Sequence, residues 1–447
     1  MTGEWWVITS LCCGIFLLGA WMAAGRADRH KTEAPASLGS TLTLLLTGAA
    51  LLRVALAATT RGYAADIGTF SAWAAHAADG LTSFYSPGYF ADYPPGYIYL
   101  LWLVGKLRLA LGIDFDTPVF LVLLKLPAIL ADIATAGLFF RLGRRYGNAT
   151  AAWFPAALYA FNPAVILDSA VWGQVDSVLT LPILLGVMLL ETSPAGAGAS
   201  FAAALLIKPQ ALIFAPLPLL WFGTRFLRRE RHAMADFLVF SGTAIAVFCL
   251  VILPFALNES PGWIISKYVS TLASYPYATL NAFNLFALTG GNIAPVGQRF
   301  LFLSYGAWGN IFIVGTVLFT TAVMLRGQAP SRLWYAPLFL SASVFVMSAK
   351  MHERYLFPAL ALALGFHIMS RDRLALLLFA GFSTTQFLNA AQVLAFSHDN
   401  IYAVPRLDPL LLTVSLVNLI LWLLLVRAGY RRYVAQTLPD PDQAARG

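Results

Sequence analysis

The chain has 447 residues, of which 59% are hydrophobic and only 11% are charged, and its mean hydropathy is +0.72. A soluble globular protein carries about 25% charged residues, so this composition excludes a soluble domain and predicts a protein that spans a bilayer. The formal net charge of +8 lies in short basic clusters beside apolar runs, which is typical of a polytopic membrane protein, and we expect no nucleic acid partner.

Apolar runs follow one another along almost the whole chain, and many approach the roughly 20 residues that one crossing needs. We therefore expect an all-α polytopic membrane protein with a bundle of about 11–13 transmembrane helices. Residues 1–39 would add an N-terminal helix and a cytoplasmic loop to a core at 40–427, and residues 428–447 would form a cytoplasmic tail. The runs fall near residues 5–25, 40–58, 118–141, 150–168, 176–191, 199–222, 236–257, 300–325, 333–349, 355–369, 374–396 and 408–427.

Basic clusters beside these runs orient the chain, because Lys and Arg concentrate in cytoplasmic loops. Placing all of them in the cytoplasm puts the N-terminus outside and the C-terminus inside, in a bacterial or archaeal plasma membrane. The clusters are Arg26, Arg29 and Lys31; Arg141, Arg144 and Arg145; Arg225, Arg228, Arg229 and Arg231; Arg326 and Arg332; Arg371 and Arg373; and Arg431 and Arg432.

Two segments do not fit as ordinary crossings under this orientation. Residues 93–112 must keep both ends outside, which favours an interfacial or re-entrant helix. Residues 202–223 must begin and end on the same face, with Lys208 at the turn between two half-length helices. Irregular backbone at membrane depth is tolerated where it lines a cavity, so both segments predict a cavity at the outer face.

The first outer loop contains an amphipathic segment between Asp66 and Asp79, which we expect to lie on the membrane as a helix. Asp66 stands at its start, where helix N-terminal NH groups favour a carboxylate. It could be a plain N-cap or a functional group, and both interpretations stay open. The apolar residues that define the buried face are Ile67, Phe70, Trp73, Ala74 and Ala77.

A second outer motif, WGQVD, brings together Trp172, Gln174 and Asp176 at the start of an apolar run. An aromatic ring beside an amide and a carboxylate can hold a sugar, but an interfacial Trp with an N-capping Asp is an equally good interpretation. Within the run at 118–141, Lys125 and Asp132 are seven residues apart, and we expect them to form a structural pair. Arg53 would extend toward the membrane interface.

A third outer motif, KMHERY, places Lys350, His352 and Arg354 around the single carboxylate of Glu353. Idle cations are disfavoured on this side of the membrane, so the surplus charge favours an anionic ligand such as a lipid phosphate. Glu353 would then hold Arg354 or Lys350 in place, and Lys208 could add to the same field. The plainer interpretation is a solvated loop of salt bridges.

The ordered set of an Asp-led outer helix, DYPPGY, WGQVDS, YPYATLNAFNLF and KMHERYLFP resembles the GT-C fold membrane glycosyltransferases. The likeness is to prokaryotic relatives of GPI-anchor mannosyltransferase II and, more loosely, to dolichyl-phosphate-glucose-dependent glucosyltransferases, and it runs from about residue 40 to 425. The resemblance implies inverting transfer of a hexose such as mannose from a polyprenyl-phosphate donor to a lipid or glycan acceptor, on the extracytoplasmic face.

The resemblance also implies roles for individual residues. Asp66 matches the catalytic carboxylate, which would act as general base. The donor phosphate would be held by Lys350, His352 and Arg354, with help from Lys208 and with Glu353 behind them. The sugar or acceptor site would be shaped by Trp172, Gln174 and Asp176, and Asp92 and Tyr93 would position the Asp66 helix.

Asp66 lacks the adjacent acidic residue that some other GT-C branches carry, so we expect activity without a metal or another cofactor. Two alternatives remain open. A transporter or flippase of a lipid-linked saccharide would also contain broken helices and buried charges, although it usually shows two matching halves. A catalytically inactive scaffold or partner subunit, in contact with membrane lipids, is the third interpretation.

Overall fold

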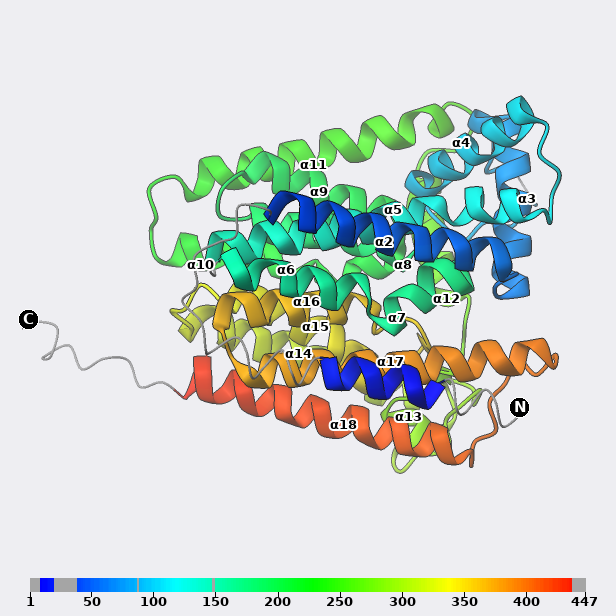
Figure 1. Ribbon diagram of the computed structural model, residues 1–447. Coiled ribbons are helices and arrows are strands. Elements are labelled where there is room, and N and C mark those ends of the chain that lie inside the picture. Colours follow the sequence, from blue (N-terminus) through cyan, green and yellow to red (C-terminus); the bar gives the residue numbers. More distant parts are fainter. Residues whose placement is uncertain (1–8, 20–37, 87, 147–148, 436–447) are drawn as a thin grey trace, which may run out of the picture.

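The computed structural model describes residues 9–19, 38–86, 88–146 and 149–435, and these residues are almost entirely helical (Figure 1). The all-α prediction is therefore confirmed. The strands in this part of the chain are two residues long each. They are β1 (Thr279–Leu280), which pairs in parallel with β4 (Met351–His352), and β2 (Arg299–Phe300), which pairs antiparallel with β3 (Leu303–Ser304).

Among the described residues, seven helices are long and apolar enough to cross a membrane, or eight if one bent pair forms a single span. The seven are α2 (Leu38–Thr59), α5 (Pro118–Tyr146), η3 with α10 (Pro209–Phe214 and Pro216–Leu227), α11 (Ala233–Ala256), α14 (Tyr305–Arg326), α17 (Arg373–His398) and α18 (Pro409–Gly429) with η4 (Tyr430–Val434). The bent pair joins α6 (Ala149–Ala160) to α7 (Pro163–Ile166) and η2 (Leu167–Trp172) at 46°.

Five shorter apolar helices accompany these spans, and the predicted total of 11–13 crossings requires that they cross as well. They are Thr9–Gly19, α8 (Asp176–Leu189), α9 (Pro194–Ile207), α15 (Arg332–Met347) and α16 (Phe357–Ser370). The rest of the predicted N-terminal run, and residues 436–447 of the predicted tail, lie outside the described residues. The remaining helices are α3 (Ala64–Asp79), η1 (Leu81–Ser83), α4 (Pro95–Leu111), α12 (Trp263–Ala273) and α13 (Leu285–Leu288).

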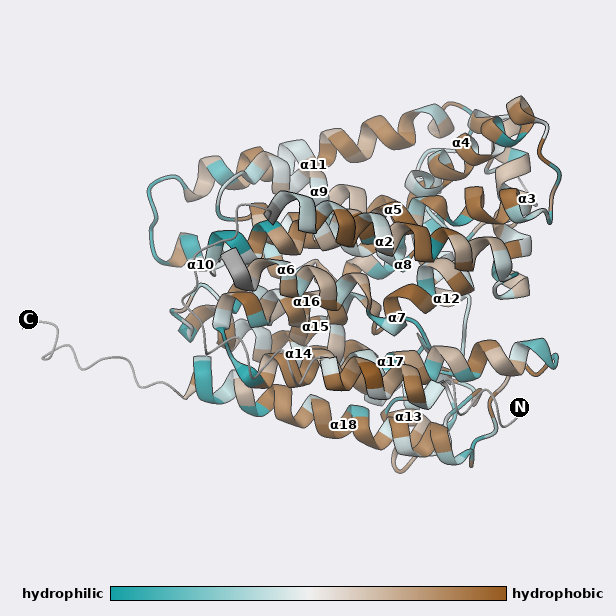
Figure 2. Ribbon diagram, in the orientation of Figure 1, coloured by the Kyte–Doolittle hydropathy of each residue, from teal (hydrophilic) through white to brown (hydrophobic). Residues whose placement is uncertain are grey.

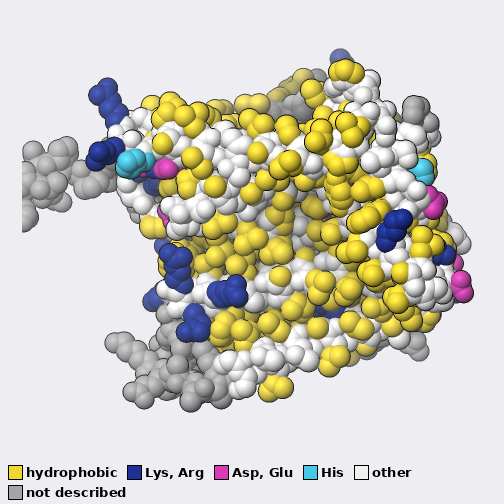
Figure 3. Space-filling model, turned by 90° about the horizontal axis from the view of Figure 1, so that it is seen from above, with side chains coloured by type: hydrophobic (Ala, Val, Ile, Leu, Met, Phe, Trp, Pro, Cys, Tyr) yellow, Lys and Arg dark blue, Asp and Glu magenta, His cyan; other side chains and the backbone are white. Residues whose placement is uncertain are grey.

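The bundle is apolar on its outer surface as well as inside, as expected for a protein surrounded by lipid. All of α15 is buried at the centre, whereas only 6% of the most apolar window of α11 is buried. Figure 2 shows brown, apolar residues along the outer helices, and Figure 3 shows a broad apolar belt on one face, with Lys and Arg gathered mainly toward one end. The structure thus agrees with a multi-pass membrane protein.

The predicted cytoplasmic clusters in the described part of the chain lie together at one end of the bundle, whereas Arg26, Arg29 and Lys31 lie outside the described residues. Arg371 donates to the Tyr146 carbonyl at 2.6 Å, Arg432 lies 3.5 Å from Asp372, and η4 packs on α14 at the same end. In Figure 1 this end, on the left, is opposite α3 and α4. This is the arrangement that the positive-inside rule requires, although the orientation itself stays a prediction.

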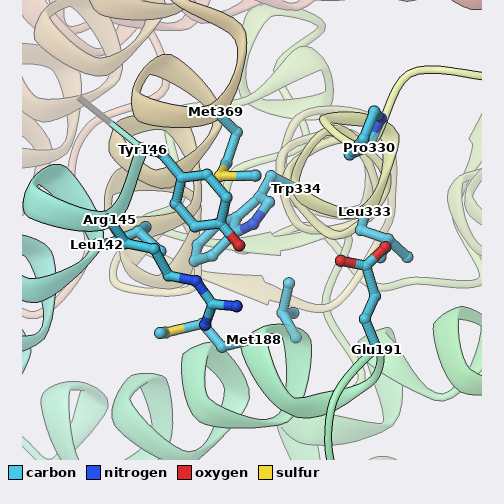
Figure 4. A pocket seen from close by; sticks show the side chains of 10 residues that line it. Leu142, Arg145, Tyr146, Met188, Glu191, Pro330, Leu333, Trp334 and Met369 are labelled. Atoms are coloured by element: carbon cyan, nitrogen blue, oxygen red, sulfur yellow. The ribbon is translucent and has the colours of Figure 1, made fainter.

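A small cavity opens at the basic end, between α5, α8, α15 and α16. Arg145 and Glu191 face it from opposite sides, and Trp334 and Met369 form apolar walls (Figure 4). It is separated from the outer motifs by the length of the bundle. The sequence-predicted site residues all lie elsewhere.

The two predicted irregular segments are a separate helix and a helix break. α4 packs on α3 at close range, because a Cβ on Gly105 would lie 2.1 Å from the carbonyl oxygen of Ala74. The break falls at Lys208, which is extended (φ −152°) between α9 and η3. Pro209 disfavours a helical conformation at Lys208, so the sequence located this break correctly.

Candidate functional site

Asp66 lies in the first turn of α3, but it does not cap the helix. The N-cap is Tyr63, and no side chain caps the helix there. The Asp66 carboxylate instead turns toward the end of η2, where its Oδ2 accepts hydrogen bonds from Trp172 Nε1 at 2.6 Å and Gln174 Nε2 at 2.7 Å. The N-cap interpretation was therefore wrong, and Asp66 belongs to a side-chain cluster.

The backbone before α3 is fastened directly to the WGQVD motif. Tyr63 donates its amide proton to the Trp172 carbonyl oxygen at 3.2 Å. Gly62 has φ +83°, and a Cβ there would lie 2.3 Å from that same oxygen. Only glycine fits this approach, so Gly62 lets the backbone before α3 lie directly against Trp172.

The buried charges in the helices pair differently from the prediction. Asp132 binds Arg53 at 2.9 Å, Ser169 at 2.6 Å and Ser177 at 2.5 Å. Two helical turns separate Lys125 from Asp132 by about 10 Å along α5, which is too far for a direct pair. Arg53 is fully buried, so it does not extend to the interface. Lys125 donates instead to the backbone carbonyl oxygens of Thr60, Ala170 and Val171.

Residues of the predicted outer motifs meet Lys208 in a group that we call the ionic cluster: Asp66, Asp176, Lys208, Glu353 and Arg354. Arg354 pairs with Glu353, and its guanidinium lies 3.5 Å from Asp66 and 3.8 Å from Asp176. Lys208 pairs with Asp176 at 2.6 Å. The cluster has three carboxylates and two cations, so the predicted surplus of positive charge around KMHERY is wrong.

The pairing of Glu353 with Arg354 confirms the predicted contact between them. The short β1–β4 ladder and the buried amide of Gln386, which donates to the Glu353 carbonyl at 3.0 Å, fix the backbone of this loop. Burial raises the pKa of Glu353, and the Arg354 guanidinium opposes this shift. Burial lowers the pKa of Arg354, but the carboxylates of Glu353, Asp66 and Asp176 outweigh it and hold this pKa well above its ordinary value, so Arg354 stays charged.

The four residues predicted to hold a phosphate do not all come together. Arg354 and Lys208 lie in the ionic cluster. Lys350 donates from Nζ to the Leu272 carbonyl oxygen at 3.0 Å. His352 packs against the rings of Tyr275 and Tyr355, with centroids 4.7 and 5.0 Å away. Burial, and then Arg354 and Lys208, lower the pKa of His352 to about 3, so its ring is neutral.

The half-buried, neutral His352 predicts a loss of stability in acid. Below its ordinary pKa of 6.5 and above about 3, the unfolded chain binds a proton that the folded chain does not. The free energy of unfolding therefore falls as the pH drops through this window, by up to about 2 kcal/mol at pH 5 relative to pH 7.

The measurement is thermal unfolding in detergent at both pH values. His352→Phe keeps an aromatic ring against Tyr275 and Tyr355 and should lose this part of the pH dependence. His398→Phe, at an exposed position near the end of α17, is the matched control and should keep it. Identical pH dependence in the wild type and His352→Phe would contradict the prediction.

The WGQVD residues lie behind Asp66 and Lys208 rather than at an open surface. Trp172 is fully buried, with Tyr63 stacked on its ring at 4.7 Å and the Arg354 guanidinium 4.7 Å from its centroid. No face of this ring is open to a sugar. Asp176 is also fully buried, against Lys208. These residues therefore orient Asp66 and the cations.

Asp92 and Tyr93 have separate positions. The Tyr93 ring packs on α3 against Phe70 and Trp73, with centroids 5.8 and 5.5 Å away, and its hydroxyl lies 3.3 Å from Gln174 Oε1. This contact agrees with the predicted support of the Asp66 helix. Asp92 accepts from the Tyr275 hydroxyl at 3.2 Å, and burial raises its pKa. It fastens the segment after α12 rather than α3.

Sequence reasoning missed several residues of this site. Tyr63 stacks on Trp172, and the only sequence feature that could have indicated this role is its position three residues before Asp66. Asp168 is buried near Asp176 with neither carboxylate oxygen hydrogen-bonded, and no sequence pattern distinguished it from a structural residue. Asn281 lies in the motif YPYATLNAFNLF, which contributed to the family resemblance, but no role was predicted for any of its residues. Over the described ranges, no group of three or more His, Cys, Asp or Glu side chains could hold a metal ion.

No protein-family model matches this chain, and neither does any curated protein in the comparison. The chemistry must therefore be argued from the site. It offers one partly exposed carboxylate held by neutral and cationic donors, beside two buried cations held by carboxylates. Such a site can remove a proton from a hydroxyl and can stabilise an anionic leaving group.

Proposed function

We propose that this protein is an inverting glycosyltransferase that moves a hexose, with mannose as the first candidate, from a polyprenyl-phosphate donor to a lipid or glycan acceptor outside the cytoplasm. One observation carries this proposal. Asp66 Oδ2 faces three donors, from Trp172, Gln174 and Arg354, whereas Oδ1 has no hydrogen-bond partner in the described part of the chain. The Asp66 side chain is 22% exposed, so a substrate hydroxyl can reach it.

Asp66 acts as the general base in this proposal. The acceptor oxygen attacks the anomeric carbon of the donor while its proton moves to Asp66 Oδ1. The bond from the anomeric carbon to the phosphate oxygen breaks, and its electron pair leaves with the lipid phosphate. One displacement inverts the anomeric configuration. The donors on Oδ2 keep the carboxylate in one orientation for this transfer.

Lys208 and Arg354 stabilise the departing phosphate. Lys208 Nζ forms one ion pair, with Asp176, which leaves two of its N–H groups to bind oxygen. Arg354 Nε has no hydrogen-bond partner. Both side chains are nearly buried, and a cation acts more strongly on developing charge where water is excluded.

The direct test is transfer of radiolabelled mannose from polyprenyl-phosphate mannose in purified membranes that contain the wild-type protein. Formation of a labelled glycolipid or glycan supports the proposal. If mannose and other common hexose donors give no transfer, the proposal fails. Movement of an intact lipid-linked saccharide across proteoliposomes would then favour the transporter interpretation.

Transfer is expected to be independent of divalent metal ions. The site balances its charges with Lys208 and Arg354, and the carboxylates nearest to Asp66 are already paired with these cations. Excess EDTA should leave the initial rate of mannose transfer unchanged. A loss of activity that Mg²⁺ or Mn²⁺ restores would contradict this prediction.

A further inference from the structure

The motif YPYATLNAFNLF contains Asn281, a buried residue whose polar groups are all hydrogen-bonded. Asn281 directly follows β1 and has φ +51°, a conformation that asparagine tolerates better than most residues. Its backbone N–H donates to Asn292 Oδ1 at 2.8 Å, and its backbone carbonyl oxygen accepts from Asn389 Nδ2 at 2.7 Å. In the side chain, Nδ2 donates to the Tyr402 carbonyl oxygen at 2.9 Å. The side-chain Oδ1 accepts from Val404 N at 2.9 Å and from Asn292 Nδ2 at 3.1 Å.

One side of Asn281 is fixed to the loop that carries Arg354. β1 pairs with β4, and Asn281 itself forms a bridge with His352. At the opposite end of the same ladder, the backbone N–H of Lys350 donates to the Ala278 carbonyl oxygen at 3.0 Å. Arg354 follows two residues after His352, so the position of its guanidinium depends on this ladder.

The side chain of Asn281 is fixed to a different loop, between α17 and α18. It forms hydrogen bonds with the backbone of Tyr402 and Val404, which are 121 and 123 residues away in sequence. The Tyr402 ring is 50% exposed and stands perpendicular to the Tyr63 ring, with centroids 6.3 Å apart. Tyr63 in turn stacks on Trp172, the donor to Asp66 Oδ2.

We propose that Asn281 is a positioning residue of the candidate site, which sets Arg354 and the Tyr402 loop at a fixed separation on two sides of Asp66. No other described side chain bonds both the Tyr402 backbone and the Val404 backbone while its own backbone extends the β1–β4 ladder. The kinetic part of this inference rests on the proposed glycosyl transfer. The structural part does not.

Two variants separate this role from general stability. Asn281→Asp keeps the shape of the side chain but replaces the Nδ2 donor with an oxygen that faces the Tyr402 carbonyl. Asn418→Asp is the matched control, because Asn418 is equally buried and its Nδ2 donates to the Phe283 carbonyl oxygen at 2.8 Å. It removes the same kind of bond from the same motif but touches neither loop.

The first measurement is amide hydrogen exchange by mass spectrometry on the full-length protein in detergent. Asn281→Asp at pH 7 should speed exchange about tenfold in both 350–355 and 400–406, since one buried hydrogen bond is worth about this factor. Asn418→Asp should leave both segments as in the wild type. Unchanged exchange in either segment of Asn281→Asp would overturn the inference.

The second measurement is the rate of mannose transfer, relative to the wild type at each pH. A displacement of about 1 Å can cost about 10²-fold in rate, so Asn281→Asp should reduce kcat by about this factor at pH 8. At pH 5 a protonated carboxyl can donate to the Tyr402 carbonyl, and the ratio to the wild type should recover. Asn418→Asp should show no such pH-dependent recovery.

The outcomes of the two measurements are distinguishable. Faster exchange in both segments without transfer by the wild type refutes the proposed function and leaves the positioning role in place. Transfer by the wild type, together with equal kcat in Asn281→Asp and Asn418→Asp, refutes the positioning role alone.

Discussion

Replacing Asp66 with Asn is expected to lower the rate of mannose transfer by about 10²–10⁴-fold, the usual contribution of a general base. The amide has nearly the same shape but cannot take the acceptor proton. Binding of the donor should persist, because Lys208 and Arg354 remain. The measurement is the initial transfer rate, together with retention of labelled donor by the purified protein.

Asp79→Asn is the matched control for this experiment. Asp79 ends the same helix, α3, but is exposed and lies outside the ionic cluster. It should retain the wild-type rate. If Asp66→Asn transfers mannose as fast as Asp79→Asn, Asp66 is not the base.

Replacing Arg53 with Met is expected to reduce the free energy of unfolding by about 3–5 kcal/mol, because it leaves Asp132 buried without its ion-pair partner. Both side chains are fully buried, and only Ser169 and Ser177 would remain as donors to the carboxylate. The double variant Arg53→Met with Asp132→Leu removes both charges and should recover much of this loss. Denaturant unfolding in detergent micelles measures the free energy of unfolding of the wild type, the single variant and the double variant.

Arg225→Met provides the partly exposed comparison. Arg225 pairs with Glu230 and Asp236, whose side chains are 43% and 30% exposed, so each of these solvent-screened pairs should contribute less than about 1 kcal/mol. If Arg53→Met is no more destabilising than Arg225→Met, then the buried pair does not stabilise the bundle as the geometry indicates. A double variant less stable than the single one would argue that Asp132 has another essential partner.

Local sequence patterns predicted the elements that position the site. The five apolar residues expected on the buried face of the 66–79 helix, from Ile67 to Ala77, are all buried. The helix break at Lys208 follows from Pro209 alone. Both signals depend on neighbours within a few residues, and hydropathy along the chain likewise determines which segments can cross a membrane.

Partner choice among the charged residues did not follow from the sequence. Lys125 and Asp132 share one helix, yet Asp132 pairs with Arg53, which is 79 residues away. Asp66 finds its donors on residues 106 and 108 positions later. Such contacts depend on how the helices pack.

The sequence by itself determined an all-helical membrane protein, the amphipathic α3 helix and the motifs that supply most of the ionic cluster. Only the tertiary structure decided that Asp66 is not a helix cap, that His352 is neutral and that Trp172 is closed to a sugar. The physical reason is that hydropathy and backbone preference act over a few residues, whereas burial and ion pairing act between segments that only packing brings together.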